Sequence, residues 1–432
     1  MNETYDKIII GAGAAGLMAA YSSCVENKGV DPKQRLLLLE RKDVVGKKIT
    51  ATGNGKCNYT NSVQNKDCYR SCDPDKAYRI IQSYDHEHII KMFHNLGILP
   101  RERNGYYYPY GEQAKSVRDV LKNAVTNLGA EIRTGAFVTD INCSKDKYTV
   151  ICADGSKYTA KKLIITAGGC AAPVFGTDGS IFGILKKLGI KIVTPKPALC
   201  GLKTDYRYLK NIDGVRLKCN CSLYSKDVRN VIYSEAGEII FSKNGISGIP
   251  VMNLSRSAIN EMDKNLSCGL ILDMFPDMEE WELESFLAMA ASTKGGPVST
   301  ALSAVVNDKL LKLLIRESGM ELEDHADRFN REKRKSCFSK LAKLLKNFTI
   351  NITGNNGFEN AQTTQGGVSL DEIDEMSMEC KKYQGMFFAG EVLDVDGMCG
   401  GYNLQWAWTT GYLAGLYACF DHEKTDFRKN RY

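Results

Sequence analysis

Residues 11–16 read Gly-Ala-Gly-Ala-Ala-Gly, and this short segment constrains the fold more than any other part of the chain. It follows an apolar run at residues 5–10 and precedes further apolar residues, a pattern that predicts a strand, a tight turn and a helix. Gly11 would permit the turn, Gly13 would let the backbone approach a pyrophosphate, and Gly16 would allow close packing of helix on strand. The phosphates would then lie at the helix N-terminus, so the segment predicts a dinucleotide site.

A second apolar run at residues 36–39 ends at Glu40 and completes a predicted strand–helix–strand unit. A carboxylate at the end of this strand is placed to accept hydrogen bonds from a ribose. This context favours a dinucleotide site over a purely structural glycine turn. The glycine pattern alone does not distinguish FAD from NAD.

The C-terminal part of the chain favours FAD. Residues 387–391 predict a further strand that ends in Gly390 and Glu391, and Gly400 and Gly401 precede an apolar helix. The amides at the start of that helix would stabilise negative charge on a reduced isoalloxazine ring; the alternative is a helix that only caps the domain. The sequence holds no second Gly-x-Gly-x-x-Gly, so NADH or NADPH would dock directly beside the flavin rather than in a domain of its own.

The order of the predicted elements indicates an α/β chain with an inserted segment. Short strands with a hairpin turn at Asp154-Gly155 lie within residues 131–160, and residues 202–240 again predict β-structure, with turns at Asp213-Gly214 and Ala236-Gly237. Helical periodicity at residues 278–291 and 298–318 precedes a strand at residues 348–353. The domains are therefore predicted as 1–195 (N-terminal part of the cofactor domain), 196–275 (first part of a β-domain), 276–346 (helical insertion), 347–362 (return strand of the β-domain) and 363–432 (C-terminal part of the cofactor domain).

The net charge and the number of cysteines limit which partners and which cellular compartment are expected. The net charge of +6, from 57 Lys and Arg against 51 Asp and Glu, is mild and argues against a nucleic-acid partner. Residues 328–346 are the densest basic stretch, which is typical of a solvated helix face but would also attract an anionic substrate or cofactor phosphate. Fifteen scattered cysteines without an export signal indicate reduced thiols in the cytoplasm. Neither a metal site nor a membrane span is predicted.

At this point the sequence resembles a family of bacterial flavoproteins that includes the BaiN-type bile-acid reductases, the YhiN-type proteins and aminoacetone oxidase. The matching segments are residues 11–16, 46–61, 245–248, 365–368, 390–397 and 400–405. The resemblance implies a Rossmann-like, glutathione-reductase-like FAD-binding domain with an inserted β-barrel-like domain and a nested helical domain. Residues 242–244 depart from the pattern, because relatives often carry a Thr-His-type sequence before Gly245.

Carried over position by position, the resemblance makes Glu40 the adenosine-ribose ligand and Glu391 a partner of the ribityl chain. It places Asn403 and Leu404 near the flavin pyrimidine and the loop of residues 54–58 beside the flavin. Arg41, Lys47 and Lys48 would neighbour the adenosine or the pyrophosphate. FAD is predicted to bind non-covalently, and no catalytic residue is assigned. The complete predicted FAD site consists of Gly11, Gly13, Ala14, Ala15, Gly16, Glu40, Arg41, Lys47, Lys48, Asn54, Gly55, Cys57, Asn58, Val138, Ala167, Gly168, Gly390, Glu391, Asn403 and Leu404.

Two features near this site have alternative interpretations. Cys57 lies in the loop beside the flavin but lacks a Cys-x-x-Cys partner, so a packing or polar-contact role is favoured over disulfide exchange. Tyr106, Tyr107, Tyr108 and Tyr110 form an aromatic cluster that either packs the core or surface or lines a substrate pocket.

The resemblance also guides the functional hypotheses. The leading one is an NAD(P)H-dependent reductase of an apolar, conjugated small molecule such as a 3-oxo bile-acid or steroid-like enone, with FAD as the cofactor. The alternative is a flavin-dependent amine or aminoketone oxidase that uses oxygen and forms hydrogen peroxide. A third class is a flavin sensor or an RNA-modification factor, against which the mild charge argues.

Overall fold

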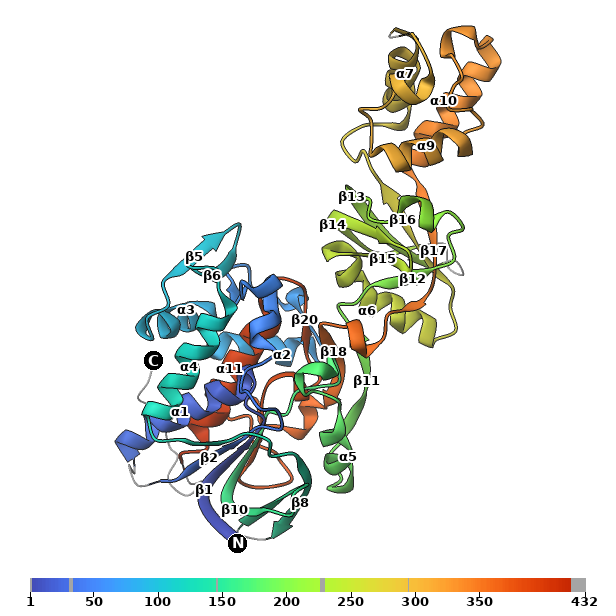
Figure 1. Ribbon diagram of the computed structural model, residues 1–432. Helices are drawn as coiled ribbons and strands as arrows, with labels where there is room; N and C mark the ends of the chain where they lie inside the picture. Colours follow the sequence, from blue (N-terminus) through green and yellow to red (C-terminus); the bar gives the residue numbers. More distant parts are fainter. Residues whose placement is uncertain (1, 31–33, 145–146, 226–229, 294, 421–432) are drawn as a thin grey trace. The chain divides into compact units, whose positions relative to one another are not determined.

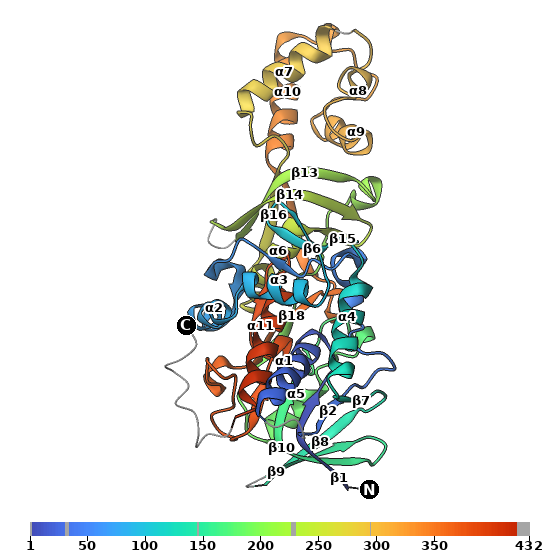
Figure 2. The same cartoon turned by 90° about the vertical axis from the view of Figure 1, so that its left-hand side faces the viewer.

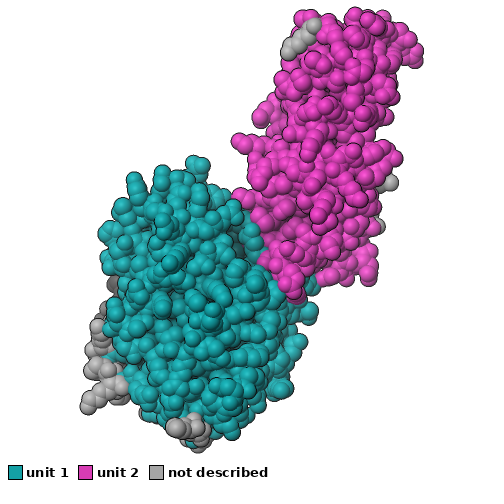
Figure 3. Space-filling model, in the orientation of Figure 1, with its two compact units in different colours: residues 1–197, 362–432 teal, residues 198–361 magenta. Residues whose placement is uncertain are grey.

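The computed structural model describes residues 2–30, 34–144, 147–225, 230–293 and 295–420. The chain forms two compact units, which Figure 3 shows in different colours. The first unit comprises Met1–Pro197 and Gln362–Tyr432, and the second comprises Ala198–Ala361. The chain therefore leaves the first unit once and returns to it.

The first unit is organised around a largely parallel sheet (Figure 1). Among the described residues the strand order is β7-β2-β1-β10-β9-β8, and β19 pairs with the last three residues of β10, beyond the part that pairs with β9. β1 runs parallel to β2 and β10, whereas β9 and β10 are antiparallel and joined through Asp154 and Gly155, as the sequence predicts. The strands are β1 (Asn2–Ile10), β2 (Leu36–Leu39), β7 (Glu131–Arg133), β8 (Val138–Ser144), β9 (Lys147–Cys152), β10 (Lys157–Ile165) and β19 (Met386–Phe388).

The central strands are buried on both faces, which explains their continuous apolar runs. Ile8, Ile9 and all four leucines of β2 are inaccessible or nearly so. Helices α1 (Ala14–Val30) and α11 (Tyr402–Tyr417) lie side by side in Figures 1 and 2 and pack closely. Gly411 and Gly415 permit this packing, since a Cβ atom at either position would lie within 2.5 Å of a backbone oxygen of α1. The two ends of the sequence thus share one core.

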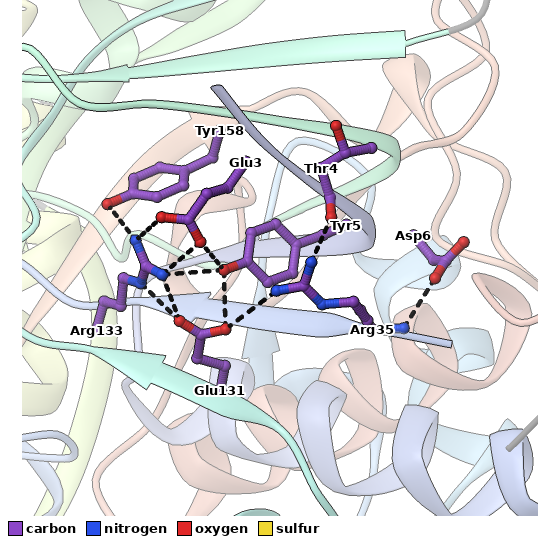
Figure 4. A network of polar contacts seen from close by, with 8 residues as sticks. All are labelled: Glu3, Thr4, Tyr5, Asp6, Arg35, Glu131, Arg133 and Tyr158. Carbon is purple, nitrogen blue, oxygen red and sulfur yellow. Dashed lines mark hydrogen bonds and ion pairs between the residues drawn. The ribbon is translucent and has the colours of Figure 1, made fainter. Parts of the chain in front are cut away.

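A network of charged and phenolic groups joins the strands at the start of β1 (Figure 4). The Arg133 guanidinium donates hydrogen bonds to Glu3 (2.8 Å) and to the Tyr158 hydroxyl (3.0 Å), and Tyr5 donates to Glu131 (2.8 Å). Its hydrogen bonds connect residues of β1, β7 and β10, so the network ties these three strands together.

The first unit also contains smaller sheets and further helices. A three-stranded sheet has the order β3-β6-β5, and two-stranded sheets form from β4 with β20 and from β11 with β18. These elements are β3 (Thr60–Asn61), β4 (Tyr69–Arg70), α2 (Pro74–Ser83), α3 (His86–Asn95), β5 (Pro100–Arg103), β6 (Tyr106–Pro109), α4 (Ala114–Asn127), α5 (Ser180–Lys187), β11 (Ile192–Ala198), β18 (Thr363–Val368) and β20 (Asp396–Gly397).

The second unit contains a closed antiparallel barrel with a helical segment inserted between two of its strands. The barrel order is β12-β15-β14-β13-β16-β17, and alternate residues of its strands fill the interior. Its strands are β12 (Leu202–Thr204), β13 (Arg216–Ser225), β14 (Val231–Ser242), β15 (Gly245–Gly248), β16 (Cys268–Asp273) and β17 (Phe348–Asn355). The helices are α6 (Ile249–Asp263), then α7 (Glu280–Thr293), α8 (Val298–Ala301), α9 (Asp308–Glu317) and α10 (Arg331–Lys346) between β16 and β17. The predicted α/β class with a barrel and nested helices is confirmed.

Two local predictions are wrong. Gly237 lies inside β14 opposite Cys219 instead of in a turn, and a Cβ atom there would lie 3.0 Å from Pro250. Glycine at this position thus reflects a close approach of α6 rather than a change of chain direction. The expected helix at residues 298–318 is divided into α8 and α9, because the Asn307 side chain caps a new helix start by accepting a hydrogen bond from the Lys309 amide. None of the helices in the described residues is long and apolar enough to cross a membrane.

Candidate functional site

The turn between β1 and α1 is held by backbone packing. Gly11 has φ +99°, and a Cβ atom there would lie 2.6 Å from the Thr166 carbonyl oxygen. A Cβ atom on Gly16 would lie 1.9 Å from the Gly11 oxygen, whereas one on Gly13 would meet nothing within 4 Å. The Thr166 hydroxyl fixes the turn further by donating a hydrogen bond to the Gly11 oxygen (2.7 Å). Gly11 and Gly16 are therefore required by packing, while Gly13 leaves open space at the start of α1.

Glu40 closes β2 and reaches back to this turn. Its carboxylate oxygens accept hydrogen bonds from the amides of Ala12 and Lys42, each at 2.9 Å. Burial raises the pKa of Glu40, although these hydrogen bonds act in the opposite direction. A carboxylate oxygen has two lone pairs, so each oxygen retains capacity for a ribose hydroxyl.

Arg41 joins the end of β2 to the loop that follows β10. Its guanidinium lies 2.7 Å from the Asp178 carboxylate and 4.3 Å from the centre of the Phe137 ring. Burial raises the pKa of Asp178, but hydrogen bonds from Arg41 and Ser180 outweigh it and lower the pKa to about 2. Arg41 is thus held in place by partners on both sides.

The two predicted lysines have different surroundings. The Lys48 ammonium lies 2.6 Å from Glu391 Oε2, and both side chains are largely shielded. Lys47 pairs with exposed Asp43 at 2.9 Å. The structure therefore brings Lys48 to Glu391, the predicted ribityl partner, and leaves Lys47 at the surface.

The loop of residues 54–58 adopts a strained backbone. Asn54 and Cys57 have φ values of +52° and +58°, a region that residues other than glycine rarely adopt. Cys57 is completely buried, and burial raises its pKa to about 12. Its thiol is accordingly protonated at neutral pH, which supports the packing role over disulfide exchange. Gly55, at φ +82°, completes the turn.

The start of α11 lies against this loop. A Cβ atom on Gly401 would lie 2.8 Å from the Thr60 oxygen and 2.9 Å from Asn58 Oδ1. Asn58 Oδ1 is buried without a hydrogen-bond partner among the described residues. An unsatisfied buried amide oxygen costs about 1–3 kcal/mol, so a donor on a ligand would relieve it.

Asn403 follows on the first turn of α11, but its side chain is occupied. Its Oδ1 accepts a hydrogen bond from the Gly397 amide (2.8 Å), and its Nδ2 donates to the Gly397 oxygen (2.9 Å). Leu404 is partly buried against the core. Asn403 therefore shapes the turn before the helix with its side chain.

The other predicted site residues belong to several elements of the first unit, and those after β19 and β10 follow the carboxyl ends of these strands. Gly390 packs directly on Ala15, because a Cβ atom on Gly390 would lie 2.7 Å from the Ala15 Cβ. Its oxygen accepts a hydrogen bond from the Trp406 indole (3.1 Å). The remaining positions are Ala14, the first residue of α1, Val138, the buried first residue of β8, and Ala167 and Gly168, which follow Thr166 after the end of β10.

Thr364 is a site residue that the sequence argument missed. Its hydroxyl accepts hydrogen bonds from the amides of Cys170 (2.7 Å) and Ala171 (2.9 Å), and its own amide donates to Glu391 (3.1 Å). It therefore positions Glu391 and the loop after β10 together. The available signal was its place directly before the matching segment of residues 365–368.

The residues present fit a flavin dinucleotide. The start of α1 is open at Gly13, Glu40 retains acceptor capacity, and Asn58 has an unsatisfied buried oxygen near the start of α11. Two helix N-termini, those of α1 and α11, offer amides for anionic groups. Such a site suits a pyrophosphate at one end and a flavin ring at the other.

The family follows from comparison with known proteins. Residues 5–417 match the model described as HI0933-like protein Rossmann domain. The chain belongs to this family. It is 33% identical over 410 residues to the 3-dehydro-bile acid delta(4,6)-reductase of Clostridium scindens, a match that covers 94% of this chain and 97% of the relative.

Two further relatives in this family carry a different name. The ribosomal RNA dihydrouridine synthase of Haemophilus influenzae is 28% identical and that of Escherichia coli 25%, and each match covers at least 95% of both chains. The structure of a 3-ketosteroid-delta4-(5alpha)-dehydrogenase from Rhodococcus jostii has a TM-score of 0.50, with 97% of each chain covered. At 12% identity this likeness shows the fold alone. The family and the site make the chain an FAD-dependent oxidoreductase, as predicted.

Proposed function

We propose that the chain is an NAD(P)H-dependent reductase that saturates a carbon–carbon double bond conjugated to a carbonyl group in an apolar, steroid-like molecule. The observation that carries this proposal is the match to a named bile-acid reductase along nearly the whole chain. The cofactor site at the carboxyl edge of the sheet supports it. Reduction of such a double bond consumes one hydride and one proton, and NADH or NADPH supplies the hydride.

The proposal assigns FAD contacts to the predicted site residues. The amides at the start of α1, beside Gly11, Gly13 and Gly16, would hold the pyrophosphate. Glu40 would accept the adenosine ribose, with Arg41 beside it. Glu391, with Lys48 as its counter-ion, would contact the ribityl chain. The other assigned residues are Ala14, Ala15, Lys47, Asn54, Gly55, Cys57, Asn58, Val138, Ala167, Gly168, Gly390, Asn403 and Leu404.

Bound FAD supplies the two-electron chemistry between nicotinamide and substrate. The protein contributes position and charge. The amides at the start of α11 would stabilise negative charge, because a helix N-terminus carries a partial positive charge. Asn403 keeps that helix start in place through Gly397. The sequence has no second glycine fingerprint, so donor and acceptor would approach the same cofactor in turn.

A second candidate substrate is a uridine base in RNA. The two relatives named ribosomal RNA dihydrouridine synthase favour it. The chemistry is of the same kind, since the 5,6 double bond of uracil is conjugated to a carbonyl group. These two relatives weigh against the expectation from charge that nucleic acid is not a partner.

The test is anaerobic incubation of the purified holoprotein and NADPH or NADH with a 3-oxo-4-ene steroid acid or with ribosomal RNA. We expect the saturated ketone by mass spectrometry and no dihydrouridine in the RNA. Dihydrouridine without steroid reduction would transfer the assignment to the second candidate. A separate incubation in air, with an aminoketone and without nicotinamide, tests the oxidase alternative. Hydrogen peroxide formed there, with neither reduction in the anaerobic assay, would contradict both candidates.

A further inference from the structure

The hairpin of β5 and β6 has one face that alternates basic and aromatic side chains. Arg101 pairs with Tyr108 and Arg103 with Tyr106 across the two antiparallel strands. Residues two apart in a strand point to the same side, and directly opposed residues share that side. These four side chains therefore form one surface, which we call the Arg/Tyr face.

The single carboxylate within the strands of this hairpin lies on the other side. Glu102 is opposite Tyr107, and the Tyr107 ring lies 6.4 Å from that of Tyr59. Glu102 Oε1 accepts a hydrogen bond from the Gly105 amide (2.5 Å) in the hairpin turn. Glu102 therefore does not neutralise the arginines.

One other carboxylate, that of Glu112, is shared between the two arginines of the face and the neighbouring Lys56. Glu112 Oε2 lies 3.0 Å from the Lys56 ammonium, and its Oε1 lies 3.4 Å from the Arg101 guanidinium. Arg103 also pairs with Glu112 Oε1. The three cationic side chains are 40–49% exposed and Glu112 is 19% exposed. Three positive charges against one negative charge leave an excess that attracts an anion.

The Arg/Tyr face adjoins both segments that are expected to flank the flavin. A Cβ atom on Gly400 would lie 3.0 Å from the Tyr106 ring, and one on Gly53 would lie 3.9 Å from the Tyr108 ring. Gly400 precedes α11, and Gly53 precedes the loop of residues 54–58 that contains Lys56. A molecule on this face is thus at the border of the proposed flavin site.

We propose that the Arg/Tyr face binds the anionic group of the acceptor substrate, with a flat part of the substrate against Tyr106 or Tyr108. Guanidinium groups bind carboxylate and phosphate through paired charge-assisted hydrogen bonds. Glu112 is the internal counter-ion that the substrate anion replaces. The inference rests on the proposed function in one respect: the ligand of this face is taken to be the molecule that the flavin reduces.

The required chemistry is an anionic oxygen group attached near a flat or ring-shaped part of the molecule. A carboxylate on a steroid-like acid supplies it, and so does the phosphate of a uridine nucleotide. The two sources are distinguished with uncharged counterparts of each ligand, namely a methyl ester and a nucleoside.

The experiment is a titration of the oxidised holoprotein, followed by the change in the visible spectrum of its flavin. The probes are a 3-oxo-4-ene steroid acid, its methyl ester, uridine 5′-monophosphate and uridine. The double variant Arg101→Gln/Arg103→Gln is compared with Arg79→Gln, which removes an exposed arginine paired with Glu375 at 2.9 Å. We expect the double variant to weaken binding of the anionic probe about tenfold or more. The uncharged counterpart and the control should change less than about twofold.

Glu112→Gln gives a prediction of the opposite sign. If Glu112 competes with the substrate anion, its neutralisation tightens binding of the anionic probe several-fold. If the cluster only stabilises the hairpin, the same change weakens or does not alter binding. Retention of FAD and the thermal unfolding temperature of each variant show whether the fold is intact.

The outcomes separate this inference from the proposed function. A double variant that loses anionic and uncharged probes equally contradicts the inference, as does a wild-type protein that binds neither anion more tightly than its uncharged counterpart. Binding with the expected arginine dependence, but without turnover on NADPH or NADH, contradicts the proposed function alone. If the double variant weakens binding of uridine 5′-monophosphate alone, and not of uridine or the steroid probes, the Arg/Tyr face still binds an anion, and that anion is the nucleotide phosphate.

Discussion

The glycine-rich turn and the Arg/Tyr face belong to the same unit but are constrained in different ways. The turn is specified by backbone atoms, since Gly11 and Gly16 have no room for a Cβ atom. The face combines Tyr106 and Tyr108 with two half-exposed arginines that pair with Glu112, and exchange of such exposed charges costs little folding free energy. On the two proposals made above, cofactor binding is tied to the fold itself, whereas substrate choice depends on side chains that can vary. The predictions below examine this difference.

The largest effect is expected from Gly16→Val. The new Cβ atom would lie 1.9 Å from the Gly11 oxygen, so the turn or α1 must shift. Such overpacking against backbone should cost about 3 kcal/mol or more of the free energy of unfolding. Chemical denaturation of the apoprotein measures this loss. A variant as stable as the wild type would show that the turn is not set by packing.

Gly13→Val separates cofactor binding from folding at the same turn. Its Cβ atom would meet nothing within 4 Å of the protein, so the stability of the apoprotein should change by less than about 1 kcal/mol. FAD retention after gel filtration should nevertheless be lost, because the side chain would occupy the space assigned to the pyrophosphate. A stable variant that keeps its yellow colour would disprove the assignment of Gly13.

An intermediate effect is expected from Glu391→Gln. The change removes the counter-ion of Lys48 while leaving an amide that accepts a hydrogen bond from Thr364. We expect FAD to bind about tenfold more weakly, equivalent to about 1.4 kcal/mol. Asp308→Asn is the matched control, because it removes the exposed partner of Lys312, which has no assigned FAD contact. Equal FAD affinity in Glu391→Gln and wild type would remove the proposed ribityl role.

The smallest effect concerns Asp178. Its pKa of about 2 in the folded protein lies below the usual value near 4. Between these two pH values the unfolded chain therefore binds more protons at Asp178 than the folded chain does. The stability that Asp178 provides is therefore present above about pH 4 and is lost as the pH falls towards 2. Asp178 is partly exposed, so this contribution should stay below about 1 kcal/mol. Urea unfolding at pH 6 and pH 3 should show a larger acid-induced loss in wild type than in Asp178→Asn, and equal losses would contradict the pairing with Arg41.

The parts of the fold that could be predicted are those governed by backbone geometry and periodicity. The strand, turn and helix around residues 11–16 and the hairpin at Asp154-Gly155 are confirmed, because glycine spacing and alternation report local conformation directly. The prediction of a turn at Gly237 is wrong, because the sequence does not distinguish a glycine required by the close approach of Pro250 from a glycine required by a turn. Tertiary contact, rather than local preference, decided that position.

The candidate site shows the same limit. The sequence indicated Lys48 and Glu391 separately, but their 2.6 Å pairing depends on how distant segments fold together. Thr364 was missed for the same reason, since its two backbone donors lie far from it in the sequence. The Arg/Tyr face became recognisable only from the strand register, which places Arg101 opposite Tyr108.

The most direct test of the central claim is a visible absorption spectrum of the purified protein, recorded anaerobically before and after addition of NADPH or NADH. We expect the absorption bands of bound oxidised flavin, and their loss when the nicotinamide is added. A coloured protein that is not bleached would contradict the reductase assignment. A colourless protein that takes up no FAD would contradict the cofactor site itself.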